Sequence, residues 1–194
     1  MTVFPRPMTG LDSANRGTVT TLYKLTDSQG MTHDFTYWHA DSYKRLTPTG
    51  QPELCTSTVF HAYRNVNLAY LLNPIHANFT DPRCYLVEGE VVVEDWGKVG
   101  CFELRVLERV EPPTWYGSKR YQVQIQFAVL CAEAVLVLYE DRYPNDQRVR
   151  HAIEAAKAYL AEPTRDTAEV ARMAAGAAAE AARTAEAART AAEA

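Results

Sequence analysis

The sequence lacks the common motifs for phosphate binding and for nucleophilic catalysis. It contains no G-x-x-x-x-G-K-[ST] loop, no G-x-G-x-x-G turn and no G-x-S-x-G elbow. Those motifs wrap backbone amides around a phosphate or raise a serine above a sheet, so P-loop, Rossmann and α/β-hydrolase chemistry have no support. Whether the chain is an enzyme stays open, and no catalytic residue is assigned.

Close cysteine pairs and an apolar leader are also missing. The four cysteines, Cys55, Cys84, Cys101 and Cys131, form no C-x-x-C pair, and the start MTVFPRPMTG has no apolar core. We therefore expect free thiols, most of them buried, in the reducing cytoplasm of a bacterial host.

Metal, membrane and nucleic-acid functions have little support. Cys55, His61, His76 and Cys84 are zinc-compatible residue types, but their spacing fits no compact site, so we expect no metal. The most apolar run, 127–138, is too short to span a bilayer. The net charge of -4 does not favour a nucleic-acid partner.

The pattern predicts an α+β fold in three parts. Residues 1–17 have no periodicity and indicate a flexible arm. An α+β domain follows over 18–160, with a small mixed or antiparallel sheet region at 18–118 and a packed helix pair at 121–160. The chain ends in a long Ala-rich helix over 164–194, because Ala is the best helix former.

β-branched and aromatic residues, bounded by Gly, Pro and Asp, predict the strands. We expect them at 18–25, 54–60, 84–93 and 100–110, with an extended aromatic stretch at 35–39. A helix over 65–72 should end at Asn73, since the residue before a proline is pushed out of the α region.

Three more helices follow. One covers 123–139, although 121–125 also fits a last strand. The second runs to Leu160 with Asp146 as its N-cap, and the third starts near Asp166 with Glu169 completing a capping box.

The densest polar cluster lies at 60–65, where a strand meets a helix. Polar groups at such a junction are a default ligand site, and we predict that His61 and Tyr63 border the largest polar cavity. The full set of ligand-binding candidates is His61, Tyr63, Arg64, Tyr37, His76 and Glu103. The alternative is structural: a half-buried histidine bonded to backbone, a core tyrosine and a solvated loop histidine.

The Ala-rich helix also suggests assembly. Glu180, Arg183, Glu186 and Arg189 form an i,i+3 ladder. Small side chains let two helices approach closely, so we expect 164–194 to pair with a second copy. A lone helix solvated by its charged ladder is the alternative.

Two stretches carry resemblances. The order of strands and the helix face Leu68-Ala69-Tyr70-Leu71 make 22–110 resemble the layout of ADP-ribosyltransferases. That resemblance implies an NAD- or nucleotide-binding enzyme with NAD as cofactor, although the first strand offers Lys24 where the family has His or Arg. The helix pair at 127–157 is similar to one in phage-borne proteins and immunity proteins of bacteria.

These resemblances lead to three functions. The first is a phage or mobile-element accessory protein, anti-defence or immunity-like, that needs no cofactor and acts by binding a partner protein. The second is the NAD- or nucleotide-binding enzyme, and the third is a structural or assembly role of the last helix. Convergence of His61, Tyr63, Tyr37 and Glu103 in one pocket would favour the enzyme, and scatter would favour the binder.

Overall fold

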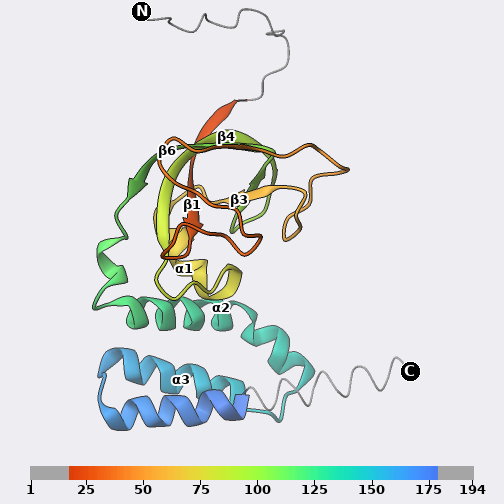
Figure 1. Ribbon diagram of the computed structural model, residues 1–194. Coiled ribbons are helices and arrows are strands. Elements are labelled where there is room, and N and C mark those ends of the chain that lie inside the picture. The colour runs from red at the N-terminus through yellow and green to blue at the C-terminus, as the bar shows by residue number, and fades with distance from the viewer. Residues whose placement is uncertain (1–17, 179–194) are drawn as a thin grey trace, which may run out of the picture. The chain divides into compact units, whose positions relative to one another are not determined.

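The computed structural model describes residues 18–178, and its contacts divide the chain into units 1–114 and 115–194. The first unit is a curled antiparallel sheet with a helix at one end, and the second is helical (Figure 1). The α+β class is thereby confirmed, with a sheet that is antiparallel throughout. The expected arm at 1–17 lies outside the described residues, and a single domain over 18–160 stays a prediction.

The longest strand, β4 (Arg83–Glu94), organises the sheet. Its first part pairs with β1 and β6 and its last part with β5, while β2 pairs with β6 and β3 with β5. Register shifts at Leu86/Val87 and at Val91/Val93 mark irregularities that bend the strand. The other strands are β1 (Val19–Thr26), β2 (Tyr43–Arg45), β3 (Phe60–Ala62), β5 (Val99–Cys101) and β6 (Glu103–Val110).

The curl of the sheet brings β1 against β3. Tyr23 and Tyr63 exchange backbone hydrogen bonds of 2.8 and 2.9 Å, although the two strands are not neighbours along the ladder. The enclosed core is aliphatic and aromatic and consists of Leu22, Trp38, Phe60, Ala62, Tyr85, Val87, Val99, Cys101, Leu104 and Val106.

The helix α1 (Val66–His76) runs further than expected. Asn65 caps its start by accepting from the Asn67 N–H at 2.7 Å. The predicted end at Asn73 is wrong, because Pro74 sits inside the last turn. The buried Asn73 side chain donates to the Phe79 carbonyl at 2.8 Å and accepts from the Phe79 N–H at 3.0 Å, which holds this turn in place.

Two predicted strands of the sheet unit differ in detail. The strand expected at 54–60 begins only at Phe60, because Cys55 adopts a left-handed φ of 65° within a run of turns. The strand expected at 100–110 is divided into β5 and β6. The stretch 35–39 is a loop with an isolated bridge from Tyr37 to Met31, and Phe35 has a φ of 59°.

The second unit contains α2 (Arg120–Arg142), α3 (Arg148–Ala161) and a further helix described over 165–178. The alternative of a strand at 121–125 is wrong, since these residues lie in α2. The predicted N-cap Asp146 is wrong by one residue, because Gln147 is the N-cap of α3 and makes no side-chain cap bond. Asp146, just before it, accepts from the Arg148 N–H at 3.0 Å.

The cap of the last helix lies earlier than predicted. Thr164 and Thr167 bond reciprocally, with the Thr167 N–H donating to Thr164 Oγ1 at 3.2 Å and the Thr164 N–H donating to Thr167 Oγ1 at 3.0 Å. Asp166 is therefore not the N-cap, and Glu169 pairs with Arg172 instead. The predicted ladder from Glu180 onward lies outside the described residues.

Candidate functional site

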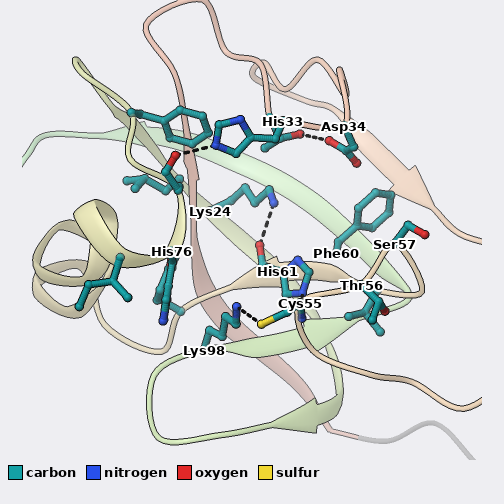
Figure 2. A pocket seen from close by; sticks show the side chains of 17 residues that line it. Lys24, His33, Asp34, Cys55, Thr56, Ser57, Phe60, His61, His76 and Lys98 are labelled. Atoms are coloured by element: carbon teal, nitrogen blue, oxygen red, sulfur yellow. Dashed lines mark hydrogen bonds between the residues drawn. The ribbon is translucent and has the colours of Figure 1, made fainter. Parts of the chain in front are cut away.

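A cavity of about 610 Å³ opens in the sheet unit, a volume that suits a small ligand (Figure 2). It is bounded by β1, β3, the end of α1 and the loop residues 32–34, 55–59, 77–79 and 98. Its wall mixes cations, hydroxyls and rings, and its lining residues are Lys24, Leu25, Thr32, His33, Asp34, Cys55, Thr56, Ser57, Val59, Phe60, His61, Tyr63, Ile75, His76, Ala77, Phe79 and Lys98.

Three of the six candidate residues meet in this cavity. His61 and Tyr63 reach it from β3 and the residue just beyond, and His76 reaches it from the last turn of α1. Size does not distinguish the cavity, because a hollow in the α2–α3 loop around Asn145 has a similar volume of about 640 Å³. What distinguishes it is the set of groups that line it.

The other three candidates lie elsewhere. Arg64 is exposed and donates to Glu94 at 2.9 and 2.5 Å. Glu103 on β6 accepts from the hydroxyl of Tyr43 on β2 at 2.7 Å, and Tyr37 is exposed. None of these three residues lines the cavity that contains His61.

His61 is held as a neutral ring. Its Nε2 accepts from the Cys55 N–H at 2.9 Å, which leaves Nδ1 to carry the proton. Burial and then the charges of Lys24 and Lys98 lower the pKa of His61 to about 4. This histidine is therefore an uncharged polar group near neutral pH.

Tyr63 and His76 form a second polar pair. The Tyr63 hydroxyl lies 3.3 Å from His76 Nδ1, and the two rings are stacked at 5.9 Å between centroids. Burial raises the pKa of Tyr63, and burial followed by the charge of Lys98 lowers the pKa of His76. The pair therefore presents neutral aromatic surface to the cavity.

Lys24 is the most unusual group in the wall. Leu22, Lys24 and Thr26 alternate on the buried face of β1, and Lys24 is only 6% exposed. Its Nζ donates to the His61 carbonyl at 2.8 Å. Burial lowers the pKa of Lys24 to about 8, so the group remains mostly charged at neutral pH.

Lys98 supplies a second buried cation, just before β5. It is 8% exposed, and its Nζ lies 2.9 Å from the Cys55 sulfur. The side chains of Lys24 and Lys98 reach the cavity on different sides of His61 (Figure 2).

The cavity wall has a single carboxylate, Asp34. Burial acts to raise its pKa, but hydrogen bonds from Thr32 and Thr36 and the charge of Lys24 together lower it. With the histidine beside the lysines neutral, two ammonium groups face one carboxylate, so the lining has an excess of positive charge.

The sequence contains a signal for Lys24 that lies outside the polar cluster at 60–65. Period-2 alternation through β1 puts Lys24 on the same face as Leu22, and a lysine on a core face is a candidate for a functional cation. Lys98 has no such signal, because it follows a Gly turn where lysines are usually solvated. Within residues 18–178 no group of three or more His, Cys, Asp or Glu is arranged to hold a metal.

The helical unit carries a different kind of site. An apolar groove of about 630 Å³ runs between its three helices. Alanines dominate its lining, and the larger side chains along it include Ile125, Val129 and Ile153. Around it the helices are joined by ion pairs such as Arg150–Glu140, at 2.6 Å.

The helix α2 is also long and apolar enough to cross a membrane, by length and composition only. Its most apolar window has a mean hydropathy of 1.6 and is 6% buried. A single helix of this kind is weak evidence for a membrane span, and the absence of a membrane partner stays a prediction.

The second unit consists of three helices that leave an apolar groove open between them. Residues 115–194 match the family model described as "Imm-5 like putative immunity protein", so this unit is immunity-like, as the helix-pair resemblance implied. No curated protein and no solved structure matches the chain.

Proposed function

We propose that the chain is an immunity protein that binds a partner protein through the groove of its helical unit. The observation that supports this most directly is that the family match at 115–194 and the apolar groove lie in the same unit. A cytoplasmic location in a bacterial host and a phage or mobile-element origin with an anti-defence role belong to the same proposal.

The groove suits an amphipathic helix of the partner. Its alanines, among them Ala128, Ala152 and Ala156, leave room for a helix to approach closely. Apolar side chains of such a helix bury against the groove in the i, i+3, i+4 pattern of helix-in-groove recognition. The polar rim, which includes Arg172, supplies orientation rather than most of the affinity.

The enzyme alternative has less support. His61 and Tyr63 share a cavity, but Tyr37 and Glu103 lie away from it, and this scatter favours a binder. NAD turnover by the purified protein, with a mass shift on a second protein, is the outcome that would restore the alternative. A purely structural role of the last helix is the third possibility, and it predicts no toxin binding at all.

The immunity proposal is tested by co-expression with candidate toxins from the protein's own genome, one at a time. The wild-type chain should restore growth against one of them and form a complex with it. Ala156→Glu places a charge in the groove and should abolish both effects. Ala158→Glu adds the same charge to an exposed position of the same helix and is the matched control.

Rescue by neither the wild type nor the control variant would contradict the immunity function. Equal rescue by both variants would keep the function and exclude the groove as the binding surface. Measuring complex formation beside growth separates lost binding from a lost fold, since a folded Ala156→Glu chain should still melt cooperatively.

A further inference from the structure

The cavity of the sheet unit contains two buried ammonium groups that the immunity function does not use. Lys24 and Lys98 are 6% and 8% exposed, and among the described residues no carboxylate oxygen lies within 4.0 Å of either. Buried charges are costly unless they are paired or bind an ion of opposite charge. This arrangement therefore needs a further explanation.

The contacts that the two lysines make inside the protein are weak for buried cations. Lys24 donates to one carbonyl, that of His61, and lies over the Trp38 ring. Lys98 contacts the sulfur of Cys55. An ammonium group has three donors, so each lysine keeps donor capacity for a ligand in the cavity that both of them line.

The remaining groups of the wall favour phosphate over carboxylate. No arginine is present to form a two-pronged bond with a carboxylate, whereas lysine binds phosphate as a point charge. The Ser57 hydroxyl adds a donor that suits a phosphate oxygen, whereas the hydroxyls of Thr32 and Thr56 already donate inside the protein, to Asp34 and to the Glu53 carbonyl. The volume of about 610 Å³ leaves room for more than a bare phosphate.

We propose that the cavity of the sheet unit binds a small phosphate-bearing molecule, whose phosphate oxygens accept hydrogen bonds from Lys24 and Lys98. His61 is the neutral neighbour of both cations, and its bond to the Cys55 N–H holds the 55–57 loop beside them. The stacked pairs Tyr63–His76 and His33–Phe79 form the aromatic part of the wall, against which the rest of the molecule packs. The site lies wholly within residues 24–98 and does not depend on the helical unit.

The test is a calorimetric titration of the full chain with inorganic pyrophosphate at pH 7. The wild type should bind it, and Lys24→Met and Lys98→Met should each weaken binding about tenfold or more, since each removes a charge-assisted contact. Arg45→Gln removes one positive charge from an exposed position outside the cavity and should bind within about twofold of the wild type. Melting curves identify any variant that fails to fold. If Lys24→Met does not fold, the comparison of Lys98→Met with Arg45→Gln decides the test alone.

Three outcomes would overturn the proposal. The first is no binding of pyrophosphate by the wild type at millimolar concentration. The second is an equal loss in Arg45→Gln and Lys98→Met, which would indicate general charge attraction. The third is citrate bound as tightly as pyrophosphate, which would show a site for any polyanion. A third measurement adds support: binding should weaken as the pH rises through about 8, where Lys24 loses its proton, and Lys24→Met should lack this dependence.

Discussion

The ammonium group of Lys24 lies 5.1 Å from the centre of the Trp38 ring, and both side chains are buried in the sheet unit. The face of an indole ring is electron-rich, so the contact stabilises the cation by about 0.5–2 kcal/mol. That is less than the cost of burying a charge, which is why the pKa of Lys24 falls to about 8.

This pKa predicts how stability depends on pH. Between pH 8 and the ordinary lysine value of 10.5, the unfolded chain binds a proton that folded Lys24 has released. The contribution of Lys24 to the free energy of unfolding therefore rises with pH across this window, by about 3 kcal/mol in total. Below pH 8 both states are protonated and the contribution is constant.

The measurement is urea denaturation of wild type and Lys24→Met from pH 7 to 10.5. The raised pKa values of Cys84 and Cys101 act in the opposite direction in both proteins, so the difference between the two is the quantity to follow. The free energy of unfolding of the wild type should rise relative to that of Lys24→Met as the pH rises. A constant difference would show that Lys24 titrates normally.

The thiols should divide into two classes. Cys55 and Cys131 are exposed, whereas Cys84 and Cys101 are buried, and burial raises their pKa values to about 12 and about 11. In native protein at pH 8 a disulfide reagent should therefore label two thiols quickly, and all four after denaturation. Cys55→Ser should lower the fast class by one, and rapid labelling of a third thiol would contradict this division of the thiols.

Asn73 should be essential for the end of α1. Its amide bonds both the N–H and the carbonyl of buried Phe79, so Asn73→Ala leaves two backbone groups unpaired. The expected loss is about 2–4 kcal/mol in the free energy of unfolding. An alanine variant as stable as wild type would disprove this role.

Asp146 should stabilise the α2–α3 connection. It accepts from the Arg148 N–H at the start of α3, from the Arg148 side chain and from the Tyr139 hydroxyl at 3.0 Å, and the hydrogen bonds from Arg148 hold the pKa of this carboxyl below its usual range. Asp146→Asn keeps an acceptor for the Arg148 N–H but loses the charge, while Asp146→Ala loses both. Thermal unfolding followed by circular dichroism should give the highest melting temperature for wild type, a lower one for Asp146→Asn and the lowest for Asp146→Ala.

Self-association through 164–194 is a prediction for the full chain. Light scattering at tens of micromolar should give the mass of two chains, and truncation after Pro163 should give that of one. A full chain that is monomeric throughout this range would exclude pairing between copies.

The sequence predicted the main elements where the pattern was strong. Alternation in β1 and β4 and the apolar stretch of α2 identified those elements. The loops were missed because Phe35 and Cys55 take left-handed backbone angles that glycine usually supplies, and composition gives no sign of this.

The candidate site was predicted in part for a similar reason. His61, Tyr63 and His76 are close in sequence, across β3 and α1, and so could be grouped by inspection. Lys24 and Lys98 come from strands and turns far from them in the chain, and they share one wall because Tyr23 bridges to Tyr63 just beyond β3 and because β5 pairs with β3. No local sequence pattern predicts long-range pairing of this kind.

The position of β4 has a consequence for folding. Its main partner β1 lies more than 50 residues earlier in the chain, with Leu22 opposite Val87, so the sheet cannot form until that long loop closes. The helical unit joins neighbouring segments, α2 to α3 across a short turn. Because folding slows as contacting residues lie further apart in the chain, the helical unit should reach its native contacts before the sheet unit, although the ribosome makes it last.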